Sequence, residues 1–426
     1  MQLNKKRTIN GALALATCSL LGIQPVQAAA ESSPTEGKDW KIDTAILSYS
    51  EKDRVDATEA NIRAQKNFGE ERFLNINFVA DTLSGASPNG AAPTDSPQTF
   101  TSPSGKETYT ADAGEIPLDD TFRDTRLQLG LSWDAPLSRV SRYNIGTNIS
   151  TEHDYTSLSL SGGYSHDFNK KNTTLTIGAA YAADSISPEG DIPTPKSSYV
   201  LESRDADSES KDVFDLVFGI TQVINARTLM QFNVGLSDTS GYQNDPYKIV
   251  SVVDNNGRPV DYLYESRPDA RTKTFFYWDT KYHTPWEDSI DLAYRYMTDD
   301  WGVDSHTVDL HYRWNISNNF YAEPHFRFYQ QTAADFYRHS VLQSEALATD
   351  DEPVSADYRL AEFDTTTVGL KLGYLLSADS ELNLRLENYQ QQGEAKPADA
   401  VGVQRNYDMY PDLDASILQI GYSVKF

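Results

Sequence analysis

The feature that most constrains the fold of this chain is an alternation of apolar and polar residues with a period of two, which recurs from Trp40 to the C-terminus. It is clearest in the last segment, where apolar residues at positions 418, 420, 422, 424 and 426 alternate with polar residues or glycine. Successive side chains of a β-strand point to opposite faces, so the pattern predicts strands with one apolar and one polar face. The fold class that follows is all-β.

The alternation predicts sixteen strands, of which the first two are more polar than the rest. They span residues 40–50, 54–66, 73–83, 126–133, 143–150, 157–165, 174–181, 213–223, 229–237, 273–282, 289–297, 303–315, 320–329, 365–376, 381–389 and 418–426. Short turns alternate with longer connections, and the five long loops span residues 84–121, 185–211, 241–270, 333–360 and 394–414. An even number of antiparallel strands with short periplasmic turns and long extracellular loops is typical of outer-membrane barrels. We therefore predict a transmembrane antiparallel β-barrel over residues 40–426, with both of its ends in the periplasm.

The apolar faces of these strands should point outward. Sixteen strands enclose a space too wide for side chains to fill, so the polar faces must line the lumen and the apolar faces must meet lipid. Beyond the extreme N-terminus, no run approaches the roughly 20 consecutive apolar residues of a membrane-spanning helix, which excludes a helical membrane protein. Aromatic residues near the predicted strand ends are expected to form interfacial girdles. They are Trp133, Tyr143, Tyr155, Phe168, Tyr282, Trp286, Trp301, Trp314 and Phe426.

The N-terminal residues predict export. A positively charged segment, an apolar run and a small-residue cleavage site identify residues 1–28 as a secretory signal peptide, followed by a short periplasmic lead at 29–39. The single cysteine, Cys18, falls inside this peptide, and the Thr17 before it is a poor fit to the small residue that precedes a lipid-modified cysteine. Export and a transmembrane barrel together predict the outer membrane of a Gram-negative bacterium.

The charge of the chain narrows its partners. Asp and Glu number 62 against 37 Lys and Arg, a net charge of −25, which argues against a nucleic-acid partner because such binding depends on Lys and Arg. The five long loops hold 28 of the acidic residues and 11 of the basic ones. They could bind Ca²⁺ through carboxylates, or form a solvated face that bridges to lipopolysaccharide through bulk cations. The second interpretation is favoured, because no ordered ligand spacing is present. Outer-membrane lipid and lipopolysaccharide are thus the expected surroundings.

The predicted lumen face has a charged wall. Its members are Arg295, Asp309, His311, Arg313, Glu323, His325, Arg327, Lys371 and Arg385, and Asp291 and Glu387 share the same face. The opposite wall is mostly uncharged, with Asn144, Asn148, Ser157, Ser159, Ser161, Thr174, Thr176, Gln231 and Asn233. A charged wall that faces a neutral one could create a transverse field that orients polar solutes. Alternatively, the charged side chains simply pair across strands in a wet interior.

No sequence motif of an enzyme is present: neither a phosphate loop, a dinucleotide fingerprint, a zinc-protease helix nor a nucleophile elbow. We therefore expect no catalytic residues, no cofactor and no metal. His306 and His311 are five residues apart, which places them on opposite faces of a strand. His311 and His325 could approach each other on adjacent strands, but Arg313 and Arg327 beside them make a cation site unfavourable.

Several motifs carry a family resemblance. They lie at residues 81–91, 122–126, 150–155, 172–175, 323–331, 334–337 and 355–360, and the first contains Gly85-Ala86-Ser87-Pro88-Asn89-Gly90. The chain resembles the Gram-negative envelope family known as domain of unknown function 3570, over nearly its whole length after the signal peptide. The resemblance implies an outer-membrane β-barrel of unassigned function, and partners among flavin-transfer and thioredoxin-like envelope proteins. It implies no catalytic residues.

The same motif has a physical interpretation. Gly85, Ser87, Pro88, Asn89 and Gly90 are turn-forming residues at the start of the first long loop. A loop with so defined a start could fold into the lumen as a constriction, or it could be an ordinary surface turn. The function that the sequence favours is a porin-like channel for small polar solutes. The alternative is a loop-plugged binding or scaffold barrel that serves an envelope redox or assembly system.

Overall fold

The structure is a computed structural model, and it describes residues 39–426 apart from 103–104, 200–203 and 347–351. The predicted signal peptide at 1–28, and all of the predicted lead at 29–39 except Asp39, lie outside the described residues. Among the residues that are described, no helix combines the length and the apolar character that a membrane span requires.

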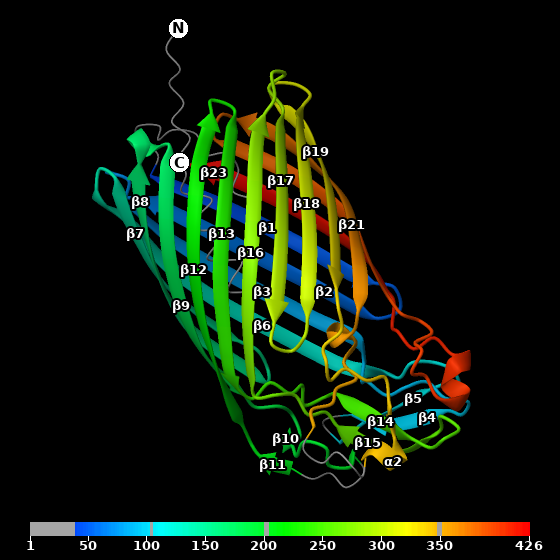
Figure 1. The fold of residues 1–426 in the computed structure, drawn as a ribbon. Coiled ribbons are helices and arrows are strands. Elements are labelled where there is room, and N and C mark those ends of the chain that lie inside the picture. The colour runs from blue at the N-terminus through cyan, green and yellow to red at the C-terminus, as the bar shows by residue number, and fades with distance from the viewer. Residues whose placement is uncertain (1–38, 103–104, 200–203, 347–351) are drawn as a thin grey trace.

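Sixteen strands of the described chain form one closed antiparallel barrel (Figure 1). They are β1 (Trp40–Glu51), β2 (Val55–Asn67), β3 (Phe73–Pro88), β6 (Leu118–Ser138), β7 (Ser141–Thr151), β8 (Tyr155–Phe168), β9 (Thr173–Ile186), β12 (Glu209–Asn225), β13 (Thr228–Gly241), β16 (Ala270–His283), β17 (Ser289–Asp299), β18 (Asp304–Asn315), β19 (Phe320–Gln331), β21 (Phe363–Ser377), β22 (Ser380–Gly393) and β23 (Leu413–Lys425). Each strand pairs with its neighbour in the chain, and β1 closes the barrel on β23, with Lys41 opposite Lys425. The predicted fold class, strand number and strand positions are confirmed.

Short and long connections alternate between the two ends of the barrel, as the sequence predicts. The connections between β2 and β3, β8 and β9, and β18 and β19 are short turns at the end where β1 begins and β23 ends (Figure 1). The five long connections gather at the other end. The first is shorter than expected, because β3 continues to Pro88 and β6 already begins at Leu118.

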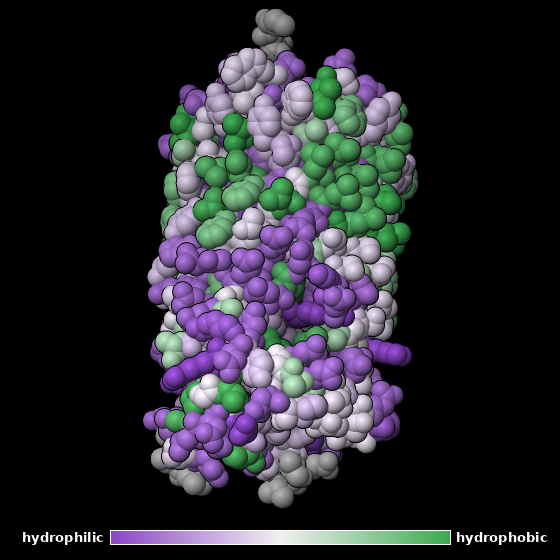
Figure 2. Space-filling model, turned by 90° about the vertical axis from the view of Figure 1, so that its right-hand side faces the viewer, coloured by the Kyte–Doolittle hydropathy of each residue, from purple (hydrophilic) through white to green (hydrophobic). Residues whose placement is uncertain are grey.

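Apolar side chains cover the outside of the barrel. Leu160, Ile420 and Val368 have exposed fractions of 61%, 52% and 58%, although they lie in the middle of long strands. Figure 2 shows that such residues form a green band over the half of the barrel nearer the termini, while the surface toward the long loops is polar. A soluble protein rarely exposes so large an apolar surface. This band is therefore the lipid-facing surface of a transmembrane barrel.

The predicted aromatic girdle is only partly correct. Trp286 and Trp314 are exposed near the turns at the terminal end of the barrel, as a girdle residue should be. Trp301 instead is 4% exposed and packs edge-on against Phe336, so its place in the girdle is wrong. Tyr155 is also misplaced, because its hydroxyl donates a hydrogen bond to Asp184, a buried residue of β9. Proximity to a strand end does not reveal which face a ring occupies.

The long loops contain structure that the alternation did not predict. Beyond the barrel strands lie β4 (Gln98–Thr101), β5 (Thr108–Ala111), β10 (Ile192–Pro193), β11 (Arg204–Ala206), β14 (Ile249–Val253), β15 (Pro259–Tyr264), β20 (Val341–Leu342), the helix α2 (Gln343–Ala346) and the 3-10 turns η1 (Asn169–Lys171), η3 (Tyr358–Leu360) and η4 (Gly402–Asn406). All except η1, which lies in the short turn between β8 and β9, belong to the five long connections. We call the described residues of 89–117, 187–208, 242–269, 332–362 and 394–412 the loop cap.

Two apolar clusters hold the loop cap together. The first joins Phe100 and Tyr109 of one loop to Ile249 and Tyr264 of another, with Tyr199 packed against them. The second groups Trp301, Val303, Ala334, Phe336 and Leu360 at the mouth of the barrel. Strand β14 also pairs with β15 and, in parallel, with β20 of the loop after β19. The cap is thus a packed body at one end of the barrel (Figure 1).

A charge on the lipid-facing surface should destabilise the barrel. Leu160 points into lipid from the middle of β8, and we expect Leu160→Lys to lower the free energy of unfolding by about 2–4 kcal/mol, because the ammonium group would enter hydrocarbon. Ser161→Lys, one residue further on the lumen face, should change it far less. Urea unfolding of the two variants in lipid vesicles measures this difference. Equal losses would contradict the assignment of the two faces.

Candidate functional site

The structure places the nine residues of the predicted charged wall on β17, β18, β19, β21 and β22. Each alternates with an outward apolar residue of its strand, such as Leu310, Phe326, Leu370 or Leu386, and so lies on the inner face. The register sets Asp309 opposite Arg327 and Glu323 opposite Lys371. It also sets His311 opposite His325, the approach that the sequence allowed. His306 lies on the other face and contacts the Tyr294 hydroxyl at 2.8 Å.

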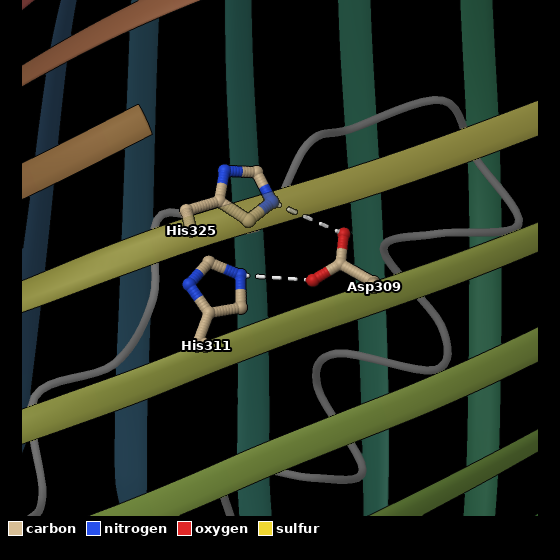
Figure 3. A group of neighbouring side chains, drawn as sticks. All are labelled: Asp309, His311 and His325. Carbon is tan, nitrogen blue, oxygen red and sulfur yellow. Dashed lines mark hydrogen bonds and ion pairs between the residues drawn. The ribbon is translucent and has the colours of Figure 1, made fainter. Parts of the chain in front are cut away.

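Two histidines and an aspartate form the centre of this wall (Figure 3). The imidazole rings of His311 and His325 stack in parallel, with their centroids 4.1 Å apart and an angle of 4° between their planes. Both rings turn their Nε2 atoms toward one carboxylate, that of Asp309. The distances are 2.9 Å from His311 Nε2 to Oδ1 and 3.4 Å from His325 Nε2 to Oδ2. We call Asp309, His311 and His325 the histidine cluster.

The other ring nitrogens of the histidine cluster also face carboxylates. His325 Nδ1 lies 2.9 Å from Glu387 Oε1, and His311 Nδ1 lies 3.7 Å from Glu323 Oε1. Glu387 reaches His325 across the intervening strand because position 369 is glycine. A Cβ there would lie only 2.7 Å from Cγ of Glu387. His311 Nδ1 itself is buried and has no hydrogen-bond partner.

The basic residues of the wall are only partly engaged with its acids. Arg327 Nε lies 4.0 Å from Asp309, and Arg385 Nε lies 3.8 Å from Glu387. Arg313 instead places its guanidinium 3.5 Å from the centroid of the Tyr321 ring, and Arg295 does the same over Phe275 at 5.0 Å. These cation–π contacts draw two positive charges away from the histidine cluster.

The neutral wall is built from the strands of the N-terminal half. Ser159, Thr174, Gln231 and Asn233 are buried on the inner face of β8, β9 and β13, and they alternate with exposed apolar residues. Gln231 Nε2 donates to Asn233 Oδ1 at 3.2 Å, which ties this wall together by hydrogen bonds between neutral groups. This part of the inner face is therefore mostly uncharged, although Asp184 of β9 and Asp215 of β12 are buried on the same side.

The glycine-rich motif lies where β3 leads into the loop cap. Asn89 is its anchor: its carbonyl accepts a hydrogen bond from Ile249 N at 2.9 Å, and its side chain bonds to the Tyr109 hydroxyl and to Ala91 N. Gly90 has φ +95°, and a Cβ there would lie 2.3 Å from the Ile249 carbonyl oxygen. Only glycine fits such a contact.

Two earlier residues of the motif meet a lysine from another loop. Lys248 donates to the carbonyl of Pro88 at 2.5 Å and to Ser87 Oγ at 3.3 Å. Gly85 adopts φ +136° at a register shift in the pairing of β3 with β6. The motif is thus a docking point between two loops, and its predicted role as a constriction of the lumen stays a prediction.

A buried ionic network, which the sequence did not reveal, joins two loops of the loop cap, 242–269 and 332–362. Arg267 contacts Glu265 at 2.8 Å and Asp357 at 2.7 Å. Arg359 contacts the same Asp357 at 2.5 Å and Asp245 at 2.5 Å. Glu265 and Asp357 are almost wholly buried. The pairs of Arg267 with Asp357 and of Arg359 with Asp245 join loops 90 and 114 positions apart, so no local pattern could show that the two loops meet.

The network sets the ionisation of its acids. Burial alone would raise the pKa of Asp357, but the guanidinium groups of Arg359 and Arg267 hold it well below its usual range. Burial also lowers the pKa of Lys248, while the nearby Asp245 opposes that effect. Asp357 therefore keeps its charge in the folded cap at a pH where a free aspartate would be protonated.

A second acidic group lies at the β7–β8 hairpin. Asp124, Glu152 and Asp154 bring carboxylate oxygens within 4.8 Å of one another. Burial, followed by the charge of Asp124, raises the pKa of Glu152 to about 7. The group lies outside the five acidic loops, so it has no bearing on the two interpretations of their charge.

Comparison with known proteins identifies a family. The model of the family described as "Protein of unknown function (DUF3570)" matches residues 10–424. No curated protein matches the chain. Solved structures similar to it include OccAB3 of Acinetobacter baumannii, with 9% identity over 92% of this chain and 100% of that one and a TM-score of 0.40. A second is OccK5 of Pseudomonas aeruginosa, with 7% identity over 93% of this chain and 100% of that one and a TM-score of 0.41. A third is OmpT of Vibrio cholerae, with 8% identity over 93% of this chain and 100% of that one and a TM-score of 0.41. Similarity at this level supports no inference about substrate.

Loss of Arg267 should loosen the loop cap and leave the barrel intact. Arg267→Ala leaves the buried Glu265 and Asp357 short of a partner, and breaking such a pair costs about 3–5 kcal/mol. We expect faster amide hydrogen exchange over residues 242–269 and 352–362 only. Because an unfolded aspartate has a pKa of about 3.9, the wild-type cap should loosen likewise as the pH falls below about 4.

The matched control is Arg258→Ala, which removes an exposed pair between the same 242–269 loop and Asp95 of the first long loop. Its hydrogen exchange should match that of the wild type. Unchanged exchange in Arg267→Ala would show that the network does not hold the cap.

Proposed function

The chain belongs to the DUF3570 family of proteins of unknown function, and membership of this family assigns it no activity. From the barrel itself, we propose that the protein is a porin-like channel for small polar solutes. The observation that carries the proposal is the closed barrel of sixteen strands, apolar outside and polar inside. Barrels of this size leave room for an aqueous passage. Its place is the outer membrane of a Gram-negative bacterium, within lipid and lipopolysaccharide.

The two walls of the lumen support selectivity. Arg327 and Arg385 project from one side, together with Asp309, Glu323 and Glu387, while the other side offers hydroxyl and amide groups. A dipolar solute between them would orient itself, with its charged end toward the wall of β17 to β22. This arrangement suits small zwitterionic or hydroxylated molecules better than apolar ones.

The loop cap supports control of entry. It lies at the end of the barrel away from the termini, and its loops are joined by apolar clusters and the buried ionic network. A cavity of about 270 Å³ opens within it, lined by Asn89, Tyr109, Glu189, Arg204 and Tyr247 among others. In this proposal, solutes reach the lumen through or beside the cap, which narrows the outer mouth.

Electrical recording tests the passage of solutes. Arg327 has a side chain that is 44% exposed inside the lumen, so removal of its charge should make the wall more negative. In planar bilayers we expect a steady conductance for the wild type, and for Arg327→Ala a reversal potential shifted toward cation selectivity. Thr176→Ala on the neutral wall should conduct like the wild type. A barrel that stays silent under all conditions would favour a plugged binding or scaffold barrel instead.

The role of the loop cap has its own test. Phe100 is fully buried among Tyr109, Tyr262 and Tyr199, and Phe100→Ala should destabilise the cap by about 3–5 kcal/mol. We expect a larger mean conductance and faster uptake of sugars into vesicles. Thr99→Ala, on the exposed face of the same hairpin, should leave both unchanged. Identical uptake for Phe100→Ala and wild type would show that the cap does not restrict entry.

A further inference from the structure

We propose that the histidine cluster binds one divalent transition-metal ion, of the Zn²⁺ or Cu²⁺ class, inside the lumen. His311 and His325 supply imidazole nitrogens and Asp309 supplies a carboxylate oxygen, and one ligand atom of each lies within 4.8 Å of the others. The three residues come from adjacent strands of one sheet, β18 and β19, whose register fixes their spacing. The proposal does not depend on whether the barrel conducts.

The distances between the ligand atoms suit a metal. Nitrogen and oxygen ligands bind Zn²⁺ at about 2.0–2.2 Å, so two ligand atoms on one ion lie about 2.9 Å apart at a right angle and about 3.4 Å apart at a tetrahedral angle. The separations in the cluster are 2.9 Å from His311 Nε2 to Asp309 Oδ1 and 3.4 Å from His325 Nε2 to the other oxygen, Asp309 Oδ2. Each imidazole nitrogen therefore lies within coordination spacing of the Asp309 carboxylate, and binding of one ion by both rings requires the stacked rings to tilt toward it.

The surroundings of His325 provide the second contact that a metal-binding histidine usually has. A histidine that binds a metal through Nε2 usually donates its Nδ1–H to a carboxylate or carbonyl, which orients the ring and makes it a better ligand. His325 Nδ1 faces Glu387 at 2.9 Å and His311 Nδ1 faces Glu323 at 3.7 Å. With the His325 proton on Nδ1, its Nε2 lone pair would face Asp309, whereas His311 Nδ1 has no hydrogen-bond partner that orients its ring in the same way.

The charged groups around the histidine cluster are compatible with a bound cation. The sequence suggested that Arg313 and Arg327 would repel one, but Arg313 lies against the Tyr321 ring and not against the histidines. Arg327 approaches Asp309 only to 4.0 Å and has a half-exposed side chain that can move into the lumen. Three carboxylates, those of Asp309, Glu323 and Glu387, surround the two rings. The expectation of no metal, which rested on neighbours along the strands, did not include these cross-strand contacts.

The donor set indicates the class of ion. Two imidazoles and one carboxylate suit Zn²⁺, Cu²⁺, Ni²⁺ or Fe²⁺, and Cu²⁺ binds such ligands most tightly among the divalent ions. Ca²⁺ and Mg²⁺ prefer sites built from oxygen alone. Three protein ligands leave at least one coordination position open to the lumen, where water or a polar solute can bind.

Metal titration of the intact, untagged barrel in detergent tests this proposal. We expect calorimetry to show one equivalent of Zn²⁺ or Cu²⁺ per chain, and the electron paramagnetic resonance spectrum of bound Cu²⁺ to show two imidazole nitrogens. His311→Ala and His325→Ala should each lower the affinity at least 100-fold. Glu387→Gln should lower it about 10–100-fold, because it weakens only the orientation of His325.

The control is His306→Ala, which removes a histidine of the same strand from the outer face and should leave the titration unchanged. The heat-modifiable mobility of folded barrels on gels verifies that each variant is folded. A second substitution, His325→Gln, preserves the size of the side chain if alanine prevents folding. The proposal is wrong if the wild type binds neither ion, or if binding survives the loss of His311 and His325.

Discussion

The pairing of the first strand with the last is the constraint on which the rest of the structure depends. Strand β1 bonds to β23 from Lys41 opposite Lys425 to Glu51 opposite Ala415, and Trp40 and Phe426 exchange backbone hydrogen bonds of 2.9 Å. Lipid offers no hydrogen-bond partners, so a sheet can cross a membrane only when no edge is left open. Closure lets apolar side chains such as Ile420 and Val368 meet lipid without exposing unpaired backbone.

Closure of the barrel also determines which side chains face the lumen. With every strand in register, the period of two sends one set of side chains to lipid and the other to the lumen, and a slip of one residue would exchange the two sets. The same register sets His311 opposite His325 and Asp309 opposite Arg327. The histidine cluster is therefore a product of strand pairing, and Gly369 lets Glu387 complete it from the next strand but one.

The sequence predicts the barrel well because the signal for each strand is local. The strand positions, the alternation of short and long connections and the facing of His311 and His325 all follow from patterns a few residues long. The loop cap does not, since Lys248 binds Pro88 from 160 residues away, and β14 pairs with β20 although four barrel strands separate them along the chain. Trp301 was placed in the girdle for the same reason: its partner Phe336 lies in another loop. The sequence places Arg313 beside the histidines, but it cannot show that the guanidinium turns to a ring on the next strand.

Accessibility of neighbouring residues to water and lipid tests the central claim, a polar lumen inside an apolar wall. The only cysteine, Cys18, lies in the predicted signal peptide, so single cysteines can be introduced without background. Thr176→Cys should react with a membrane-impermeant thiol reagent, and a fluorophore on Ile177→Cys should be quenched from the lipid phase. Equal behaviour at the two positions, or the reverse, would contradict the account.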